Sequence, residues 1–476
     1  MNAPLASALF ALLVPLSMVA PMSADAADAP LPKNLPAYGA VRSLPPLQIA
    51  QKTLPNGLTV WVLPRKEGPP KVHFVLAVRG GLAADDFQHP GFAQLLAHLM
   101  REGTTLRNSR RVAEDLQSYG AEIEIEAGND GIVLTASGLA SNSAKLITLL
   151  SEIALQPAFP ANEVDLAKLN AVQALHVSRA EPGYLAQRAL AKLVYGGHPY
   201  GNTFATESAI LSVTPELLHA EQARRFRPDS ALLVIGGRID KDAAFEMAER
   251  VFGDWRAEGK PLPVTSAAPS SMPAAHAFVE RDGSVQSAIR IGRPAIAAQS
   301  ADYFPLTLAN AVLGQGFSSR VNQNLREDKG YTYDARSTLG SQRAGGSIIA
   351  STNVRNEVTG AAIGEIVKEF TRIGNEAVPE AELTQTKRYM AGGYLLLNQS
   401  LGSVVGTLAD FWLVGLPPQT LSDYVTKIQA VSAAQVQAMG KKYYAPAQQS
   451  IVVVGDAEVR EQLKAYGEFS VTDKVD

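Results

Sequence analysis

Cysteine is absent from this chain of 476 residues. Its absence excludes disulfides, thiol catalysis and cysteine-bound zinc, so a metal site would need histidine, aspartate or glutamate ligands. A large excess of one charge is also lacking, because the 43 Lys and Arg residues nearly balance the 46 Asp and Glu residues and leave a formal net charge of −3. Without a large basic surface, we expect no nucleic-acid partner.

Histidine is scarce, and the seven histidines are scattered along the chain. No two of them lie three or four positions apart, which is the spacing that places two imidazoles on one face of a helix. The sequence also has no G-x-S-x-G elbow, no P-loop and no EF-hand loop. It therefore gives no support to the catalytic and binding classes that depend on these motifs.

Long hydrophobic runs are missing except at the N-terminus. Residues 5–22 are apolar and are followed by the small-residue sequence Ala-Asp-Ala at residues 24–26. This pattern is typical of an export signal, and we expect a cleavable signal peptide over residues 1–26 and a periplasmic mature chain without stable membrane insertion. An uncleaved anchor is the alternative, because no Lys or Arg precedes the run and the run is nearly long enough to span a bilayer.

Two proline-rich stretches divide the chain. Residues 27–48 are rich in Pro and Ala and predict an extended lead-in, so folded sequence is expected from residue 49. Residues 257–275 (AEGKPLPVTSAAPSSMPAA) show neither helical nor strand periodicity and predict a linker. We therefore expect an N-terminal domain over residues 49–256 and a C-terminal domain over residues 276–476.

The two halves resemble each other. Each ends in a predicted helix, an aromatic-x-Pro turn and a strand that runs into glycine, and each has a long predicted helix that begins after a proline. The matched pairs are Val213 with Val431, Phe226 with Tyr444 and Pro228 with Pro446 at an offset of 218, and Pro160 with Pro379, Glu163 with Glu382 and Lys168 with Lys387 at an offset of 219. Two matched segments at nearly one offset indicate a duplication.

Each half mixes strand and helix patterns without strict alternation. In the first half, strands are predicted at residues 58–63, 73–78, 122–127 and 132–137, and helices at residues 90–101, 109–118 and 143–155. This order favours the α+β class, with two tandem homologous domains that each contain a mostly antiparallel sheet backed by helices.

One predicted helix of the first half follows a glycine and lies within HPGFAQLLAHLMREGTT, residues 89–105. It resembles the metal-binding helix of the pitrilysin/insulinase family of zinc metallopeptidases, to which the mitochondrial processing peptidases belong. In that family the helix carries H-x-x-E-H, in which two imidazoles bind zinc and the Glu activates the metal-bound water. The matching positions here are Gln94, Ala97 and His98.

The family's third zinc ligand is a Glu on a later helix, and aligning the segment from residue 159 onto that helix places Ala174 at the ligand position. Of the four groups that the resemblance requires for metal and base, only His98 remains. One neutral imidazole cannot hold zinc against water, so we expect no metal on this chain.

A second segment of resemblance is LGQGFSSRVNQNLREDKGYTYDARS, residues 313–337, which is similar to the C-terminal signature of the same family. The resemblance assigns Arg326 and Tyr333 as the pair that contacts the substrate carbonyl, and it assigns Gly314 and Gly316 to the preceding loop. A guanidinium and a phenol hydroxyl suit this role, because hydrolysis places negative charge on the carbonyl oxygen.

Two alternatives remain open for this pair. Arg326 is also placed to form an ordinary surface ion pair with Glu327 or Asp328, in which case Tyr333 would simply pack on a strand. Tyr331 is a competitor for the tyrosine role, although the family spacing selects Tyr333.

The resemblance implies a catalytic chamber of four such domains, of which this chain supplies two. We therefore predict the non-catalytic subunit of a heterodimeric periplasmic zinc metallopeptidase, with Arg326 and Tyr333 acting in trans on a peptide or unfolded protein. The zinc is expected in a homologous partner subunit with an intact H-x-x-E-H. The alternatives are a catalytically dead peptide-binding or structural scaffold of the same fold, and a homodimeric enzyme that uses a different site.

Overall fold

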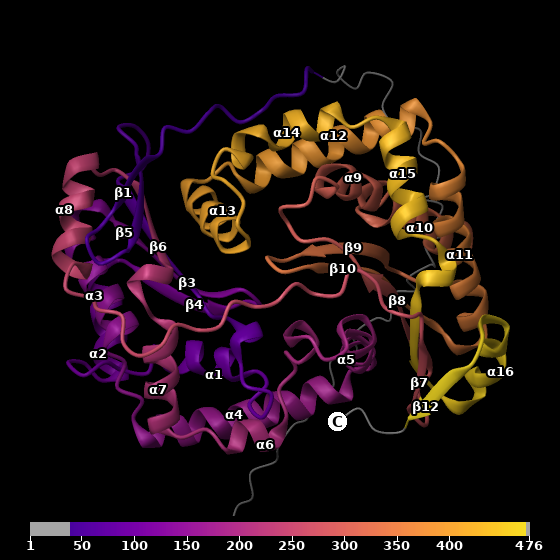
Figure 1. Cartoon of the computed structure of the whole chain (residues 1–476), viewed down its shortest axis with the longest axis horizontal. Coiled ribbons are helices and arrows are strands. Elements are labelled where there is room, and N and C mark those ends of the chain that lie inside the picture. Colours follow the sequence, from indigo (N-terminus) through magenta and orange to yellow (C-terminus); the bar gives the residue numbers. More distant parts are fainter. Residues whose placement is uncertain (1–38, 473–476) are drawn as a thin grey trace, which may run out of the picture. The chain divides into compact units, whose positions relative to one another are not determined.

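The computed structural model describes residues 39–472. The predicted signal peptide and the first part of the predicted lead-in lie outside the described residues. Over residues 39–472, no helix combines the length and the hydrophobicity that a membrane span requires. The described chain forms two six-stranded sheets with helices packed on them (Figure 1).

The first sheet has the strand order β1-β2-β6-β3-β5-β4. All neighbouring strands are antiparallel except β2 and β6, which are parallel. The strands are β1 (Ala50–Thr53), β2 (Thr59–Pro64), β3 (Lys71–Arg79), β4 (Glu122–Ala127), β5 (Gly131–Leu139) and β6 (Ala231–Gly237). The helices of this half are α1 (Phe92–Leu99), α2 (Ser109–Tyr119), α3 (Ser143–Leu155), α4 (Ala161–Ala180), α5 (Pro182–Tyr195), α6 (Glu207–Leu211), α7 (Pro215–Arg225) and α8 (Lys241–Phe252).

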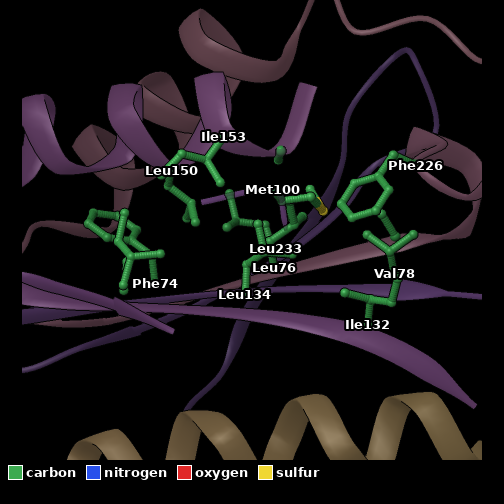
Figure 2. Close-up of a cluster of buried hydrophobic side chains, with 14 of the residues drawn as sticks. Phe74, Leu76, Val78, Met100, Ile132, Leu134, Leu150, Ile153, Phe226 and Leu233 are labelled. Atoms are coloured by element: carbon green, nitrogen blue, oxygen red, sulfur yellow. The ribbon is translucent and has the colours of Figure 1, made fainter. Parts of the chain in front are cut away.

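Strand β3 is buried on both of its faces, which explains why its sequence is a continuous apolar run rather than an alternating one. Phe74, Leu76 and Val78 point into the core between the sheet and helix α3, as Figure 2 shows. The side chains in between, Val75 and Ala77, pack on the opposite face in a separate cluster. Fully burying a side chain of this size contributes about 1.5–3 kcal/mol, so both layers stabilise the strand.

The second sheet repeats the topology of the first, with the order β12-β7-β11-β8-β10-β9. Here β7 and β11 take the place of the parallel pair β2 and β6. The strands are β7 (His276–Glu280), β8 (Gln286–Pro294), β9 (Ala335–Ser341), β10 (Gly346–Arg355), β11 (Ser450–Gly455) and β12 (Phe469–Thr472). The helical segments are α9 (Tyr303–Gly314), α10 (Arg320–Asn322), the π-helical η5 (Gln323–Asp328), α11 (Thr359–Asn375), α12 (Glu380–Leu397), α13 (Leu401–Val414), α14 (Thr420–Ala430), α15 (Ala433–Tyr443) and α16 (Arg460–Leu463).

A pair of matched lysines further shows the repeat. Lys168 on α4 donates to the Val213 carbonyl at 3.0 Å, and Lys387 on α12 donates to the Gln429 carbonyl at 2.9 Å. Two sheets of one topology with helices on their faces confirm the predicted α+β class with tandem homologous units. The sheets differ at one edge, where β1 pairs antiparallel with β2 but β12 pairs parallel with β7.

The two halves exchange a helix, a feature that the sequence analysis did not predict. Helix α5 belongs to the first half of the chain but packs on β8 and β11 of the second sheet, and α13 of the second half packs on β3 and β6 of the first sheet. In one interface Leu190 and Val194 contact the second sheet, and in the other Val405 and Leu408 contact the first. Each half therefore completes the core of the other.

The segments predicted as lead-in and linker have no helix or strand where the structure describes them, between residues 39 and 49 and between α8 and β7. Leu44 and Leu47 nevertheless pack against the cluster formed by α13 and the first sheet. In the linker, the Ala268 N–H donates to the Ala344 carbonyl at 2.7 Å. Both segments thus contact the folded part of the chain.

Candidate functional site

Helix α1 carries three of the four degenerate zinc-motif positions. Gly91 precedes the helix with φ of +81°, and a Cβ there would lie 2.7 Å from the Ala205 side chain. The Ala93 N–H in the first turn donates to the buried carboxylate of Asp85 at 3.1 Å, and Arg225 donates to the same carboxylate at 3.0 Å. Burial raises the pKa of Asp85 to about 6, against the opposite influence of Arg225 and the Ala93 N–H. The close contact at Gly91 and the hydrogen bonds to Asp85 therefore fix the start of α1.

The structure brings the motif positions together. Gln94 and His98 are exposed on α1, and with Ala174 of α4 they line a cavity of about 600 Å³. Ala97 is only 2% exposed and lines, with Gln94 and His98, a second hollow of about 470 Å³ beside β4. The positions that the resemblance pairs across two helices are thus neighbours in space.

The side chains in this cavity do not fit zinc. A structural or catalytic zinc ion takes at least three protein ligands, drawn from thiolate, imidazole and carboxylate groups. Here Gln94 offers an amide, Ala174 offers a methyl group, and His98 is the one imidazole. Within residues 39–472, no group of three or more His, Cys, Asp or Glu residues is arranged to hold a metal ion.

The predicted carbonyl-contacting pair lies in the second half, between α10 and β9. Arg326 belongs to η5, which continues α10, and Tyr333 lies in the loop that leads into β9. Both side chains line one cavity of about 640 Å³. A π-helical turn such as η5 is rare and is often found at functional sites. The structure thus places the two predicted residues together at one site.

Buried polar contacts fix the helix that carries Arg326. Arg320 donates to both carboxylate oxygens of Glu382 on α12, at 2.7 and 2.9 Å. The Asn324 amide donates to Glu365 at 2.9 Å and to Glu369 at 3.0 Å, both on α11. Bidentate Arg–carboxylate contacts set orientation as well as energy. Two neighbouring helices therefore hold η5 in place.

The loop that carries Tyr333 is tied to β10 on either side of the tyrosine. Thr332 donates to the Asn353 carbonyl at 2.8 Å, and Thr352 donates to the Asp334 carbonyl at 3.0 Å. Tyr331 is partly buried against the second core, whereas Tyr333 is 90% exposed. Within residues 39–472, the Tyr333 hydroxyl makes no hydrogen bond. This geometry leaves Tyr333, rather than Tyr331, free to contact a ligand.

Arg326 makes one of the ion pairs that the sequence left open. Its Nε lies 3.3 Å from Glu327 Oε1, and its guanidinium carbon lies 4.5 Å from the centre of the Phe317 ring. No residue that the structure describes accepts a hydrogen bond from the terminal Nη1 or Nη2. The side chain is therefore oriented by two neighbours while its outer donors stay available.

The two glycines before this site differ from each other. Gly316 lies in the loop with φ of +93°, and a Cβ there would lie 2.8 Å from the Tyr389 ring. Gly314, which was predicted in the same loop, is instead the last residue of α9, where a Cβ would clash with Ser337 of β9. Close packing of α9 on β9, rather than a turn, accounts for glycine at that position.

Two arginines in this cavity were not predicted from the sequence. Arg290 lies on β8 and Arg336 on β9, and both line the cavity with Arg326 and Tyr333. Burial, with a smaller contribution from Arg336, lowers the pKa of Arg290 to about 10. Alternation along the strand QSAIRIGRP already places Arg290 on the opposite face from its two isoleucine neighbours. Only the strand register shows that Arg336 lies on the same face as Arg290.

The repeated unit, with α1 at the degenerate motif and the Arg326–Tyr333 pair in the second copy, defines a two-domain metallopeptidase-like protein. Family models match both copies. Residues 60–208 match Insulinase (Peptidase family M16), and residues 212–390 match the Peptidase M16 inactive domain. The chain belongs to peptidase family M16.

Relatives and solved structures agree with this assignment. A Helicobacter pylori protein named non-peptidase homolog YmxG is 24% identical over 76% of this chain and 83% of its own length. A Bacillus subtilis protein named uncharacterized zinc protease YmxG is 22% identical over 74% of this chain and 86% of its own.

Among solved structures, the peptidase M16 inactive domain from Pseudomonas fluorescens is similar with a TM-score of 0.80 at 23% identity, covering 86% of this chain and 99% of that one. A protease from Helicobacter pylori is similar with a TM-score of 0.81 at 18% identity, covering 86% of this chain and 100% of that one. These likenesses establish the fold. The match to the inactive-domain model and the side chains at the zinc-motif positions support an inactive, peptidase-like member of the family.

Proposed function

We propose that this chain is the non-catalytic subunit of a heterodimeric periplasmic zinc metallopeptidase, and that it supplies Arg326 and Tyr333 to a peptide held by a homologous, zinc-bearing partner. The observation that carries the proposal is the placement of both side chains in one cavity of about 640 Å³. The periplasmic location follows from the export signal predicted over residues 1–26. Fractionation of cells that express the full chain, with and without those residues, tests the location.

The chemistry of the pair suits a peptide carbonyl. Attack on a peptide bond moves negative charge onto the carbonyl oxygen, and donors already aimed at that oxygen lower the barrier. The terminal nitrogens of Arg326 and the hydroxyl of Tyr333 are donors of this kind, and the described residues leave both without an acceptor. On this chain the pair binds and orients the carbonyl, whereas the metal and the general base belong to the partner.

The surroundings of the pair favour a fixed arrangement over a mobile surface contact. Arg326 is positioned by Glu327 and by the Phe317 ring, and η5 is held to α11 and α12 by buried polar contacts. Donors that need no reorganisation when charge develops are the ones that contribute most to catalysis. An accidental surface ion pair needs no such support.

The affinity of the purified chain for an unfolded peptide tests this proposal. A fluorescein-labelled, uncharged peptide is titrated with the parent chain, Arg326→Ala and Tyr333→Phe, and the fluorescence anisotropy is followed. We expect Arg326→Ala to weaken binding about tenfold and Tyr333→Phe about fivefold, because hydrogen bonds from charged groups are stronger than neutral ones.

Arg110→Ala serves as the matched control, because Arg110 lies on α2 with an 87% exposed side chain in a surface pair with Glu114. Its affinity should equal that of the parent chain. Equal affinities for Arg326→Ala, Tyr333→Phe and the parent chain would make the pair dispensable. That result would favour the alternative, a scaffold of the same fold.

A further inference from the structure

Two arginines flank a serine on one face of the second sheet. Arg290 on β8 lies directly opposite Ser351 on β10, and Ser351 lies directly opposite Arg336 on β9. Residues opposite each other in neighbouring strands share a face, and neighbouring strands lie about 4.8 Å apart. The two arginine Cα atoms are therefore about 10 Å apart, a span over which two long guanidinium side chains reach a common ligand.

The cavity that these arginines line has an excess of positive charge. Its lining contains four arginines and two carboxylates, which gives a formal charge of +2 (4 − 2). Asp334 Oδ2 lies 3.6 Å from Arg336 Nε, and both side chains of this ion pair are largely exposed. Arg355 pairs with Glu357, which does not line the cavity. The carboxylates present thus do not neutralise the arginines.

Arg290 is the least compensated of the four. Within residues 39–472 it makes no ion pair, and its Nη1 donates to the carbonyls of Ile289 at 2.9 Å and Thr352 at 3.3 Å. Its Nη2 lies against α5, only 2.8 Å from the position that a Cβ on Gly183 would take. A mostly buried guanidinium without a carboxylate is costly, and an anion that entered the cavity would stabilise it.

The fold itself does not require arginine at these positions. In the first sheet Val75 pairs with Val234, and in the second sheet Arg290 pairs with Val452. Val234 and Val452 are 218 residues apart (452 − 234), so Val75 and Arg290 occupy matching positions. Thr135 pairs with both Val75 and Glu124, as Ser351 pairs with both arginines. The first copy therefore has a valine and a glutamate where the second has two arginines.

We propose that Arg290 and Arg336 form a carboxylate-binding subsite for the peptide that contacts Arg326 and Tyr333. The inference rests on the proposed function, because it takes the ligand of this cavity to be a peptide. Planar guanidinium groups bind carboxylates through paired hydrogen bonds, and two of them beside the Ser351 hydroxyl match the oxygens of one carboxylate. The carboxylate comes either from an Asp or Glu side chain or from a free C-terminus.

Three labelled peptides that differ only in one side chain and in the C-terminus test the subsite by fluorescence anisotropy with the purified full chain. The first has one Glu and an amidated C-terminus, the second has Gln in place of that Glu and a free C-terminus, and the third has Gln and an amidated C-terminus. We expect the parent chain to bind at least one of the first two about tenfold more tightly than the third. Preference for the first identifies a side-chain carboxylate, and preference for the second identifies a C-terminal one.

Arg336→Gln should reduce this preference to less than about twofold. Arg290→Lys, which keeps the charge but not the paired donors, should reduce it in part. Arg110→Gln is the control for net charge, because Arg110 lies on the exposed surface of α2.

Equal binding of all three peptides by the parent chain overturns the subsite, as does an equal loss of preference in Arg110→Gln. The proposed function fails separately, when the uncharged peptide does not bind or when Arg326→Ala leaves its affinity unchanged. A chain that binds the uncharged peptide through Arg326 but ignores peptide charge therefore refutes the subsite alone.

Discussion

The two copies of the six-stranded sheet share their topology but differ in the side chains of one face. Where β8 and β9 of the second copy have Arg290 and Arg336, β3 and β4 of the first have Val75, fully buried under α13, and Glu124. The opposite face of these strands is apolar in both copies, because Phe74 and Leu76 of β3 and Ile289 and Ile291 of β8 belong to the buried cores of their own halves. On the face that carries Arg290 and Arg336, the side chains of the second copy line a cavity, so the charge of this face diverges while the fold persists.

The motif segments of the two copies show the same division. In the first copy, α1 has its packing, its preceding glycine and its anchored first turn, whereas Gln94 and Ala97 stand at motif positions and leave His98 as the one zinc-binding group of the helix. In the second copy, the exposed positions of η5 and the following loop keep Arg326 and Tyr333. Packing thus preserves both segments, and only the second retains the chemistry that the family resemblance assigns to it.

The largest effect is expected where the copies complete each other. Leu190→Ala on α5 and Leu408→Ala on α13 each remove a fully buried side chain, which costs about 2–5 kcal/mol of unfolding free energy. Hydrogen exchange should then increase in β8 and β11 for Leu190→Ala and in β3 and β6 for Leu408→Ala, together with a lower urea midpoint.

Leu169→Ala is the control for this experiment, because Leu169 on α4 is 63% exposed. It should leave both the urea midpoint and the exchange pattern unchanged. Faster exchange confined to the half in which each substitution lies would contradict the exchanged packing of the two helices.

A restored zinc site sharpens the comparison of the motif segments. Gln94→His combined with Ala174→Glu adds an imidazole and a carboxylate to the cavity that His98 already lines. Three ligands of these types are sufficient for zinc, so the double variant should retain one equivalent of zinc after dialysis, as measured by plasma mass spectrometry.

Gln94→His combined with Val177→Glu is the matched control, because Val177 is exposed on α4 but does not line the cavity. It should retain no more zinc than the parent chain. If both double variants retain the same amount, α1 and α4 do not hold the geometry of a zinc site.

The smallest effect concerns a pair of carboxylates at matching positions. Asp85 binds Arg225 in the first copy, and Asp302 accepts a hydrogen bond from Tyr443, 218 residues after Arg225 (443 − 225), at 2.7 Å in the second. Hydrogen bonds from Lys442 and Tyr443 lower the pKa of Asp302, whereas burial raises that of Asp85.

Because the folded state lowers the pKa of Asp302, its stabilising contribution is present above the ordinary pKa of about 4 and is lost as the pH falls through the lowered value. Asp302→Asn should therefore decrease the unfolding free energy by about 1 kcal/mol at pH 7 and by less in acid. Asp423→Asn, in an exposed pair with Lys427, is the control. A decrease that grows toward acid pH in urea titrations would contradict this assignment.

The sequence was sufficient to predict the elements in which the local pattern and the tertiary packing agree. The strand at residues 122–127 and the helix at residues 143–155 have the predicted bounds, since one alternates along a sheet edge and the other has a continuous buried face. The meeting of Gln94, His98 and Ala174 was also expected from the resemblance. Local periodicity and one family motif thus determined most of the first half and its degenerate site.

The remaining features depend on tertiary contacts that a local sequence pattern does not specify. The apolar faces of α5 and α13 suit either sheet, so periodicity alone cannot reveal that each packs on the sheet of the other half. Arg290 and Arg336 are 46 positions apart (336 − 290), and only the pairing of both strands with β10 places them on one face. Strand register and helix exchange are tertiary facts, and the arginine pair could not be predicted without them.

The most direct test of the central claim is the turnover of a peptide by the assembled pair of subunits. The zinc-bearing partner is combined with the parent chain or with the Arg326→Ala, Tyr333→Phe double variant, and kcat/KM is measured for each assembly. We predict that the double variant still assembles but lowers kcat/KM at least about a hundredfold, because both donors to the carbonyl oxygen are lost. A value within a few-fold of that obtained with the parent chain would contradict the account.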